Sequence, residues 1–285
     1  MIEKFTGDWL SLREAVDAAA RNRDVVQQLV AWREHHSQLT IMDLGAGSGA
    51  NFRFLAPRLG GEQRWLLLDN DSQLLDSIDA MMHRWASVNG FYIEPQTSGL
   101  RITGHQFSCL LESRQFDLRY IEDLASTQLV TASALLDLVS GVWLENLAQR
   151  CRSAGTAIYF ALTYDGLVDW QPRDKADAAV HEWVNCHQRT DKGFGPALGP
   201  QAAEFAMHCL QRQGYHVVPG RSIWQLGTDE AKLQLALAAG YAEAVMQQKE
   251  AAATWVNDWL LRRHRLITDS LSHVTVGHTD IFAYY

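Results

Sequence analysis

Cysteine is scarce in this sequence. Four cysteines are spread over 285 residues, and none belongs to a CxxC pair. A disulfide scaffold or a zinc cluster is therefore not expected, because both depend on numerous or closely spaced cysteines. His181 and His187 also lack the HExxH spacing of zinc proteases. We expect reduced thiols and no metal site.

Long apolar runs and an excess of positive charge are missing as well. No stretch of about 18 apolar residues occurs, so a transmembrane helix is not expected. The opening segment, MIEKFTGDWLSLREAVD, carries acids where a signal peptide needs an apolar core, and we expect a cytoplasmic protein with no membrane partner. The net charge of −8 at pH 7 argues against a general nucleic-acid binder, which needs a basic surface to release counterions.

The apolar content is high enough for a sizeable core, with 47% apolar and 20% charged residues. Short apolar runs, typical of buried parallel strands, alternate with segments of helical periodicity. We expect strands at 39–44, 65–68, within 100–117, and at 129–133, 156–162, 215–224 and 274–284. We expect helices at 8–37 (a pair), 50–59, 71–88, 140–152, 201–213 and 229–268, and an irregular stretch at 89–107. The alternation predicts an α/β fold with a mostly parallel sheet and helices on both faces.

A glycine-rich turn, IMDLGAGSG at 41–49, follows the first expected strand. Glycines allow positive φ angles and let backbone N–H groups come close to a ligand. In an open α/β sheet such a turn lies at the carboxyl ends of the strands, where ligands bind. Asp43 lies two residues before the first glycine, and Asp69 ends the next strand. A carboxylate at the position of Asp69 is well placed to accept both hydroxyls of a ribose.

Two classes of cofactor fit this turn. Gly45, Gly47, Ala50 and Asp69 almost match the G-x-G-x-x-G/A fingerprint of dinucleotide-binding proteins, so a nicotinamide-dependent oxidoreductase is one interpretation. Asp43 favours the second class, a cofactor that carries positive charge and no pyrophosphate. A carboxylate repels a pyrophosphate, but it suits a cationic amino group and a sulfonium.

Three segments together resemble a known family. IMDLGAGSGANFRFLAP is similar to motif I of the class I S-adenosylmethionine-dependent methyltransferases, WLLLDNDS to their second-strand motif, and QLVTASALLDLVSGVWLENLAQRC to their fourth-strand motif. The resemblance implies a doubly wound, mostly parallel seven-stranded sheet whose last strand is antiparallel, at the sheet edge. Residues 38–285 would form the methyltransferase domain, with a helical insertion at 229–268, and residues 1–37 a helical arm or lid.

The resemblance also implies S-adenosylmethionine as the cofactor and assigns residues to it. Asp43 would support the amino group of its methionine part. Asp69 would bind the ribose hydroxyls, and Asn70 would pack beside the adenine. The loop under the methionine part would consist of Gly45, Ala46, Gly47 and Gly49.

The adenine and the acceptor side correspond to later segments. The family has an acid–apolar pair after its third strand, which matches Asp117-Leu118, with Gln106-Phe107 as the alternative. The long separation from the second-strand motif implies an insertion at 89–107. Ser133, at the end of the fourth strand, would border both cofactor and acceptor.

The acceptor is expected to be a small molecule. The family's amino-methylating nucleic-acid enzymes carry a polar-Pro-Pro-aromatic motif after the fourth strand, where this chain has ASAL at 132–135, without proline. The acidic net charge also disfavours a nucleobase substrate. A cofactor-binding partner subunit without catalysis is a further alternative.

Charged side chains concentrate in the expected loop 187–196, which follows Tyr164-Asp165-Gly166 after the fifth strand. Loops at the carboxyl ends of strands often carry function. His187 or Asp191 is a candidate base, with Tyr164 as a further candidate catalytic residue. Arg189 and Lys192 would hold an anionic group of the acceptor. The alternative is a loop whose charges only face solvent.

Two helical patterns add further candidates. Arg13, Asp17 and Arg21 are four residues apart and share one helix face. Arg13 is a candidate ligand for a substrate carboxylate, and an ion-pair ladder facing solvent is the alternative. Trp255 and Trp259 are also four apart, which favours apolar packing or a homodimer contact over substrate stacking.

Overall fold

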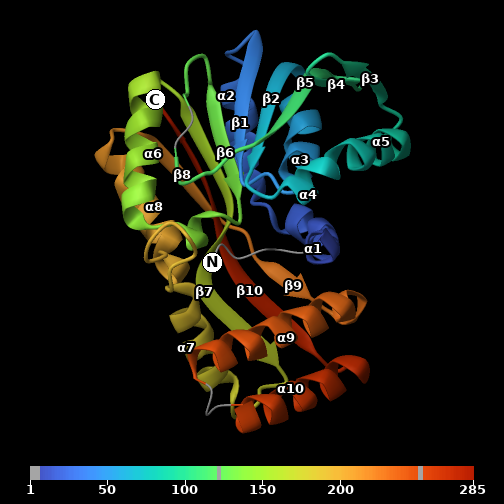
Figure 1. The fold of residues 1–285 in the computed structure, drawn as a ribbon, viewed down its shortest axis with the longest axis vertical. Helices are drawn as coiled ribbons and strands as arrows, with labels where there is room; N and C mark the ends of the chain where they lie inside the picture. Colours follow the sequence, from blue (N-terminus) through green and yellow to red (C-terminus); the bar gives the residue numbers. More distant parts are fainter. Residues whose placement is uncertain (1–6, 121–122, 250–252) are drawn as a thin grey trace.

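A computed structural model describes residues 7–120, 123–249 and 253–285, and a single ten-stranded sheet runs through them (Figure 1). The strand order is β3-β4-β5-β2-β1-β6-β7-β10-β8, and β9 pairs with β10 off this path. The strands are β1 Gln38–Leu44, β2 Gly61–Asp69, β3 Tyr92–Gln96, β4 Gly99–Thr103, β5 Phe107–Gln115, β6 Leu129–Ser133, β7 Ala157–Gln171, β8 His216–Arg221, β9 Trp224–Leu226 and β10 His273–Tyr284.

The topology confirms the doubly wound sheet and the antiparallel last strand. β5, β2, β1, β6 and β7 pair in parallel, whereas β10 is antiparallel to β7 and to β8. The expected edge position of β10 is wrong, because β8 pairs along its outer side. Most side chains of β10 are buried, which agrees with its position between β7 and β8. The strands beyond the expected seven are β3, β4 and β9.

The segment 89–107 forms a hairpin, β3–β4, instead of the irregular stretch that the sequence predicts. Leu100 and Ile102 of β4 are buried between less buried neighbours, which is the alternation of a half-buried strand. β4 pairs antiparallel with β5, and β3 is the outer strand. Pro95 obscures the pattern in β3, and proline is tolerated there because β3 is an edge strand. The hairpin is the insertion expected before the third parallel strand.

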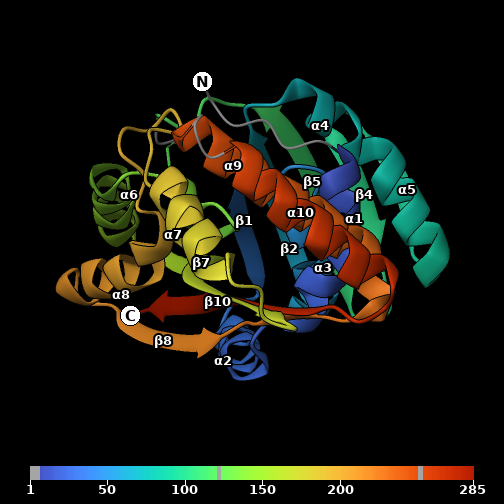
Figure 2. The same cartoon turned by 90° about the horizontal axis from the view of Figure 1, so that it is seen from below.

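Helices cover both faces of the sheet (Figures 1 and 2). One face packs against α2 Arg23–Arg33, α3 Ala50–Leu59, α4 Ser72–Asp76 and α5 Ile78–Asn89. The other face packs against α6 Gly141–Ala154 and α8 Ala202–Arg212. The helix expected at 71–88 is interrupted at Ser77 and becomes α4 and α5.

A third core lies beyond the parallel part of the sheet. There α7 Asp177–Gln188, α9 Ala231–Gln248 and α10 Ala253–Thr268 pack with β9 and with the extended ends of β7 and β10. Figure 1 shows α9 and α10 side by side across this end of the molecule. The N-terminal helix α1 Gly7–Ala20 adds Trp9, Val16 and Ala20 to the same core. α1 thereby bridges this core and the carboxyl edge of the sheet.

β7 is longer than its sequence predicts. It continues to Gln171 instead of ending at 162, so the expected loop at Tyr164-Asp165-Gly166 is wrong. Pairing with β10 explains the extension, because the register continues as far as Gln171 opposite His273. The pairing partner lies more than 100 residues away in the chain (273 − 171 = 102), so the sequence around β7 contains no pattern that predicts the extension. Two register shifts interrupt this pairing, on either side of His278 and Thr279.

Trp259 fills the third core. Its side chain is fully buried, its ring centroid lies 6.2 Å from that of Trp170, and its Nε1 donates to Asp177 at 2.8 Å. Trp255 packs, partly buried, against the same core. Apolar packing is thus confirmed for Trp259, and a homodimer contact through this side chain is wrong because its surface is already covered.

Candidate functional site

The glycine-rich turn joins β1 to α3 and is fixed from two sides. The Ala46 N–H donates to the carbonyl of Leu68 at 3.0 Å, and the Gly49 N–H donates to the carbonyl of Ala46 at 2.8 Å. Gly49 has a φ of +81°, and a Cβ there would lie 2.5 Å from Cε of Met82. The positive φ strains any residue with a side chain, and a Cβ there would also displace the flexible end of Met82. The turn therefore holds one shape between the end of β2 and helix α5.

Asp69 ends β2 and faces the turn. Its Oδ2 accepts a hydrogen bond from the Gly47 N–H at 2.8 Å, and its Oδ1 accepts one from the Asp71 N–H at 2.9 Å. Burial raises the pKa of Asp69, against the lowering effect of these hydrogen bonds. A carboxylate oxygen can accept more than one hydrogen bond. Asp69 thus retains capacity for two hydroxyl donors of a ligand.

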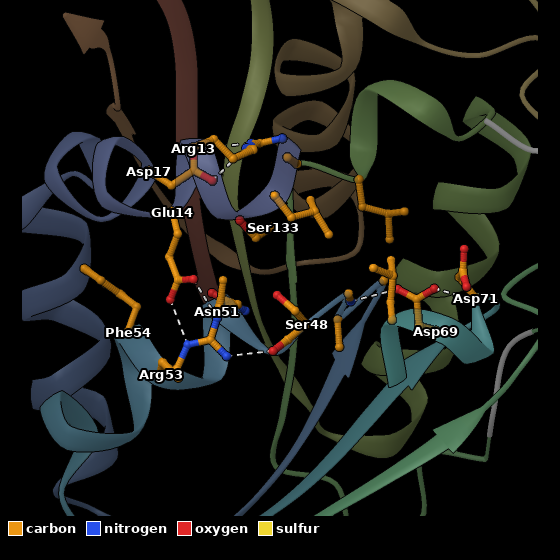
Figure 3. A pocket seen from close by; sticks show the side chains of 18 of the residues that line it. Arg13, Glu14, Asp17, Ser48, Asn51, Arg53, Phe54, Asp69, Asp71 and Ser133 are labelled. Atoms are coloured by element: carbon orange, nitrogen blue, oxygen red, sulfur yellow. Dashed lines mark hydrogen bonds and ion pairs between the residues drawn. The ribbon is translucent and has the colours of Figure 1, made fainter. Parts of the chain in front are cut away.

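A bidentate ion pair ties α1 to the turn. Arg53 donates through Nε and Nη2 to the two carboxylate oxygens of Glu14, each at 2.7 Å, and through Nη1 to the carbonyl of Ser48 at 2.6 Å. Figure 3 shows Glu14 reaching from α1 to Arg53, with Arg13 and Asp17 on the same helix and Asp69 across the pocket. α1 therefore covers the turn from the side opposite β2.

Arg21 is a buried cation at the end of α1. Its Nη2 donates to Asn51 at 3.0 Å and to Ser133 at 3.1 Å, and its Nη1 donates to the hydroxyl of Tyr159 at 3.4 Å. Burial lowers the pKa of Arg21, but its interactions with Tyr159 and Asp280 outweigh this effect, and the pKa is raised overall. Arg21 therefore stays charged beside Ser133, at the carboxyl edge of the sheet.

Asp43 lies behind the turn and not within the pocket. It is fully buried, and its Oδ1 accepts a hydrogen bond from Asn51 at 2.8 Å. Burial raises the pKa of Asp43 to about 7. Its side chain does not line the cavity beside the turn. Asp43 therefore does not face a ligand in this cavity, and the expectation that it repels a pyrophosphate and attracts a sulfonium is not supported by its position.

The cavity beside the turn has a volume of about 890 Å³. Most of the predicted cofactor residues line it: Gly45, Ala46, Gly47, Asp69, Asn70, Asp117, Leu118 and Ser133. Gly49 lies outside the lining and shapes the turn instead. Asp117 follows the carboxyl end of β5, while the alternative Gln106 precedes β5 at its opposite end. The fold thus brings Asp117 to the cavity and leaves Gln106 away from it.

A second cavity, of about 640 Å³, adjoins the first. The two share four lining residues, which are Arg13, Ala134, Leu138 and Lys192. The second cavity extends from this junction between α7, α9 and the extended strands β7 and β10. Ala134 and Leu162, which line it, have positive φ angles of 51° and 52°. Such strained positions outside glycine tend to occur near functional sites.

The predicted acceptor residues divide between the second cavity and the surface. His187, Asp191, Tyr164 and Lys192 line the cavity. Arg189 is exposed, and the fold brings it to neither cavity. Lys192 is buried, with Nζ 3.3 Å from Nδ1 of His187, and the Tyr164 hydroxyl donates to Asn185 at 2.9 Å. One part of the loop thus lines the cavity, and another part, with Arg189, faces solvent.

Arg13 borders both cavities in an ion pair. Its Nε lies 2.8 Å from Asp17, and its guanidinium lies 5.2 Å from the ring centroid of Trp224. The side chains of Arg13 and Asp17 are 13% and 14% exposed. The expected ion pair is thus present but faces the cavities, not bulk solvent.

The sequence does not identify several residues of the two cavities as site residues. Arg21 was visible only as a member of a helix face. Trp9, Trp224, Tyr241 and His278 line the second cavity, and they come from four different elements. The single sequence signal for His278 is a histidine inside an expected strand, and such a histidine is more often a satisfied core residue.

The described residues contain neither a metal-binding cluster nor a membrane-spanning helix. In residues 7–120, 123–249 and 253–285, no three His, Cys, Asp or Glu side chains are grouped so as to hold a metal ion. Within the same ranges, no helix has both the length and the apolar character needed to cross a membrane. The four cysteines are free thiols, and three of them are buried.

No protein-family model matches this chain, and no curated protein matches it. Solved structures of similar fold include YcgJ of Bacillus subtilis, at 9% identity, 92% and 99% coverage of the two chains and a TM-score of 0.48. A methyltransferase of Thiobacillus denitrificans has 14% identity, 99% and 100% coverage and a TM-score of 0.45. One of Geobacter sulfurreducens has 13% identity, 92% and 91% coverage and a TM-score of 0.43. Both methyltransferases are S-adenosylmethionine-dependent and were solved with S-adenosylhomocysteine.

Proposed function

We propose that this protein is an S-adenosylmethionine-dependent methyltransferase that acts on a small molecule. The observation that carries the proposal is the junction of two cavities. The larger has the glycine-rich turn and Asp69, and the smaller meets it at Arg13, Ala134, Leu138 and Lys192. A group transfer requires two molecules held in contact and in line, and adjoining compartments provide that geometry.

The larger cavity fits an adenosine ligand without a pyrophosphate. The N–H groups of Ala46, Gly47 and Gly49 all donate to protein acceptors. A dinucleotide-binding turn instead directs such N–H groups, with the helix N-terminus, at the pyrophosphate. Side chains of both charges, including Arg21 and Asp69, line the cavity. A mixed charge of this kind suits a ligand that carries a carboxylate and cationic groups.

The residues of the larger cavity have separable tasks under this proposal. Asp69 accepts the ribose hydroxyls, and Asp117 and Leu118 lie against the adenine. Arg21, beside Ser133, holds the carboxylate at the amino-acid end. When bound, the cofactor supplies an activated methyl group, so the chain itself mainly orients the acceptor and excludes water. α1, tied to the turn through Glu14, provides the cover.

The smaller cavity supports a small-molecule acceptor. Its volume of about 640 Å³ lies within the range of roughly 300–1,000 Å³ usual for small-molecule sites. His187, Asp191 and Tyr164 line it, and they are the candidate proton acceptors. Lys192 is buried at the junction, where water screens its charge less than at the surface.

Calorimetry with S-adenosylhomocysteine and with NADH tests the proposal. Binding of S-adenosylhomocysteine without binding of NADH supports it. Binding of NADH alone would transfer the assignment to the nicotinamide-dependent oxidoreductases. A non-catalytic partner subunit would be favoured if S-adenosylhomocysteine binds but no methyl group leaves S-adenosylmethionine for any member of a panel of hydroxylated and aminated small molecules.

A further inference from the structure

One wall of the second cavity is a continuous row of rings from four elements. Trp9 of α1 lies 6.5 Å from Trp224 of β9, Trp224 lies 5.1 Å from His278 of β10, and His278 lies 6.3 Å from Tyr164 of β7, all between ring centroids. All four rings line the cavity. Trp224 is held in place because its Nε1 donates to Asp17 at 3.0 Å while Arg13 lies over its ring.

The helix α9 contributes another part of the lining. Its small residues Ala236, Gly240 and Ala244 are four apart and therefore share one face, and all three line the cavity. Leu237 and Tyr241 of the same helix also line it. Small side chains on this face leave room for a flat molecule, and the rings of the other wall offer surfaces on which an aromatic ring stacks.

His278 is a buried polar residue of this cavity, and one of its ring nitrogens lacks a hydrogen-bond partner. Its side chain is 6% exposed, it lines the cavity, and its Nδ1 has no hydrogen-bond partner among the residues that the structure describes. Register shifts of β10 against β7 lie on both sides of it, and such irregularities re-aim side chains next to functional sites. A buried polar nitrogen without a partner is costly, so a ligand group that bonds to it binds favourably.

The imidazole of His278 is uncharged. Burial, together with the charge of Arg13, lowers its pKa to about 3, against the raising effect of hydrogen bonds with the backbone of Ser222 and Val276. A neutral imidazole offers one acceptor nitrogen and one N–H donor, and it does not attract an anion as a cation would. The remaining charged groups of the lining carry both signs, with Arg13 and Lys192 against Asp137, Asp191 and Glu243. This lining gives an anionic acceptor no net attraction.

We propose that the second cavity binds the methyl acceptor as a flat, uncharged aromatic compound whose hydroxyl or amino group hydrogen-bonds to Nδ1 of His278. The proposal rests on the methyltransferase function, because it names the acceptor class of that same site. His278 then orients the acceptor, and the rings of Trp9, Trp224 and Tyr164 hold its plane.

The ring preference is tested by calorimetry with three compounds at saturating S-adenosylhomocysteine. These are 2-naphthol, its saturated analogue decahydro-2-naphthol, and the anion 2-naphthoate. We expect 2-naphthol to bind at least about tenfold more tightly than either of the others, which corresponds to about 1.4 kcal/mol. Equal affinity for the saturated analogue would overturn the aromatic preference, and tighter binding of 2-naphthoate would overturn the uncharged class.

The role of His278 is tested with His278→Phe, which keeps a flat ring and removes both nitrogens. We expect the affinity for 2-naphthol to fall about tenfold, the size of one hydrogen bond. The affinity for naphthalene, which has no hydroxyl, should not change. An equal loss with both compounds would mean that the substitution alters only the shape of the cavity, and the hydrogen bond would be refuted.

The location is tested with Gly240→Leu. A Cβ at Gly240 meets no atom within 4 Å, and leucine is a better helix former than glycine, so the variant should fold. We expect it to lose binding of 2-naphthol and to keep that of S-adenosylhomocysteine. Ala239→Leu makes a similar change on the same helix outside the lining and should bind as the wild type does.

The outcomes separate this proposal from the methyltransferase function. If Gly240→Leu binds 2-naphthol normally, the compound lies elsewhere and the proposal fails while the cofactor assignment stands. If the wild type does not bind S-adenosylhomocysteine, the methyltransferase function fails. In that case the affinities for 2-naphthol, decahydro-2-naphthol and 2-naphthoate, measured without S-adenosylhomocysteine, still decide whether the cavity selects uncharged aromatic compounds.

Discussion

The carboxylate of Asp69 accepts a hydrogen bond from the backbone N–H of Gly47 at 2.8 Å, and so connects the end of β2 to the glycine-rich turn. One side chain thereby shapes the turn and faces the larger cavity. Asp71, two residues later, lines the same cavity but caps α4 by accepting from the Gln73 N–H at 2.9 Å. Two neighbouring acids thus have different tasks in one cavity.

Asp69→Asn should weaken binding of S-adenosylhomocysteine by at least about tenfold. The ribose hydroxyls lose a charged acceptor, and hydrogen bonds to charged groups contribute about 1.5–3 kcal/mol each. Asp71→Asn is the matched control, because it removes the same charge from the same cavity and asparagine caps a helix equally well. Calorimetry should show little change for Asp71→Asn. Equal losses of affinity for the two variants would mean that only the net charge of the cavity matters, and the hydrogen bonds that Asp69 accepts from the ribose would be refuted.

Arg21→Lys should weaken S-adenosylhomocysteine more than 5′-methylthioadenosine. The two ligands share the adenosine, but only the first carries the amino-acid part that Arg21 is proposed to hold. Lysine keeps the charge but loses the planar fork that binds a carboxylate with two hydrogen bonds. We expect a loss of about tenfold for S-adenosylhomocysteine and of less than about twofold for 5′-methylthioadenosine. Equal losses would place Arg21 away from the amino-acid end.

The sequence was informative where the site is continuous in the chain. The turn, α3 and the acid at the end of β2 occur in one segment, so their spacing alone indicated a nucleotide-type site. The contacts of Arg21 are of another kind. Its partner Tyr159 is 138 residues away, and Tyr159 in turn donates to Asp280 another 121 residues on. Contacts of that separation depend on strand order, which local patterns do not contain.

The loop after α7 shows a second limit. Arg189 and Lys192 are three residues apart in one polar segment, and composition predicts the same role for both. In the fold Arg189 is exposed and lines neither cavity, while Lys192 is buried and lines both. The direction of each side chain is set by turns such as the one in which Asp191 accepts from the N–H groups of Gly193 and Gly195. Residue type alone does not encode that direction.

Asp43→Asn should change how stability depends on pH. The pKa of Asp43 is raised from 3.8 to about 7 by burial. Between these values the unfolded chain has released the proton while the folded protein still holds it, so stability falls as pH rises. Asparagine does not titrate and can still accept from Asn51. From about pH 4 to about pH 7, the free energy of unfolding of the variant should therefore rise relative to that of the wild type, by roughly 4 kcal/mol at most.

Urea unfolding followed by circular dichroism across this pH range measures the difference between the two proteins. The difference cancels the titration of all groups that the variant leaves unchanged. A difference that stays constant with pH would show that Asp43 titrates normally in the folded protein. It would also remove burial as the dominant influence on this carboxyl.

Glu14→Gln should loosen α1 from the glycine-rich turn. The bidentate pair with Arg53 would be replaced by weaker hydrogen bonds to a neutral amide. If α1 acts as a cover, S-adenosylhomocysteine should slow hydrogen exchange of the amides of residues 7–20 in the wild type. In Glu14→Gln the exchange should be several-fold faster, and the affinity for the ligand lower. Glu34→Gln, at the exposed end of α2, removes the same charge away from the cavity and should leave both unchanged. Identical exchange of α1 with and without the ligand would exclude the cover and leave the Glu14–Arg53 pair a purely structural contact.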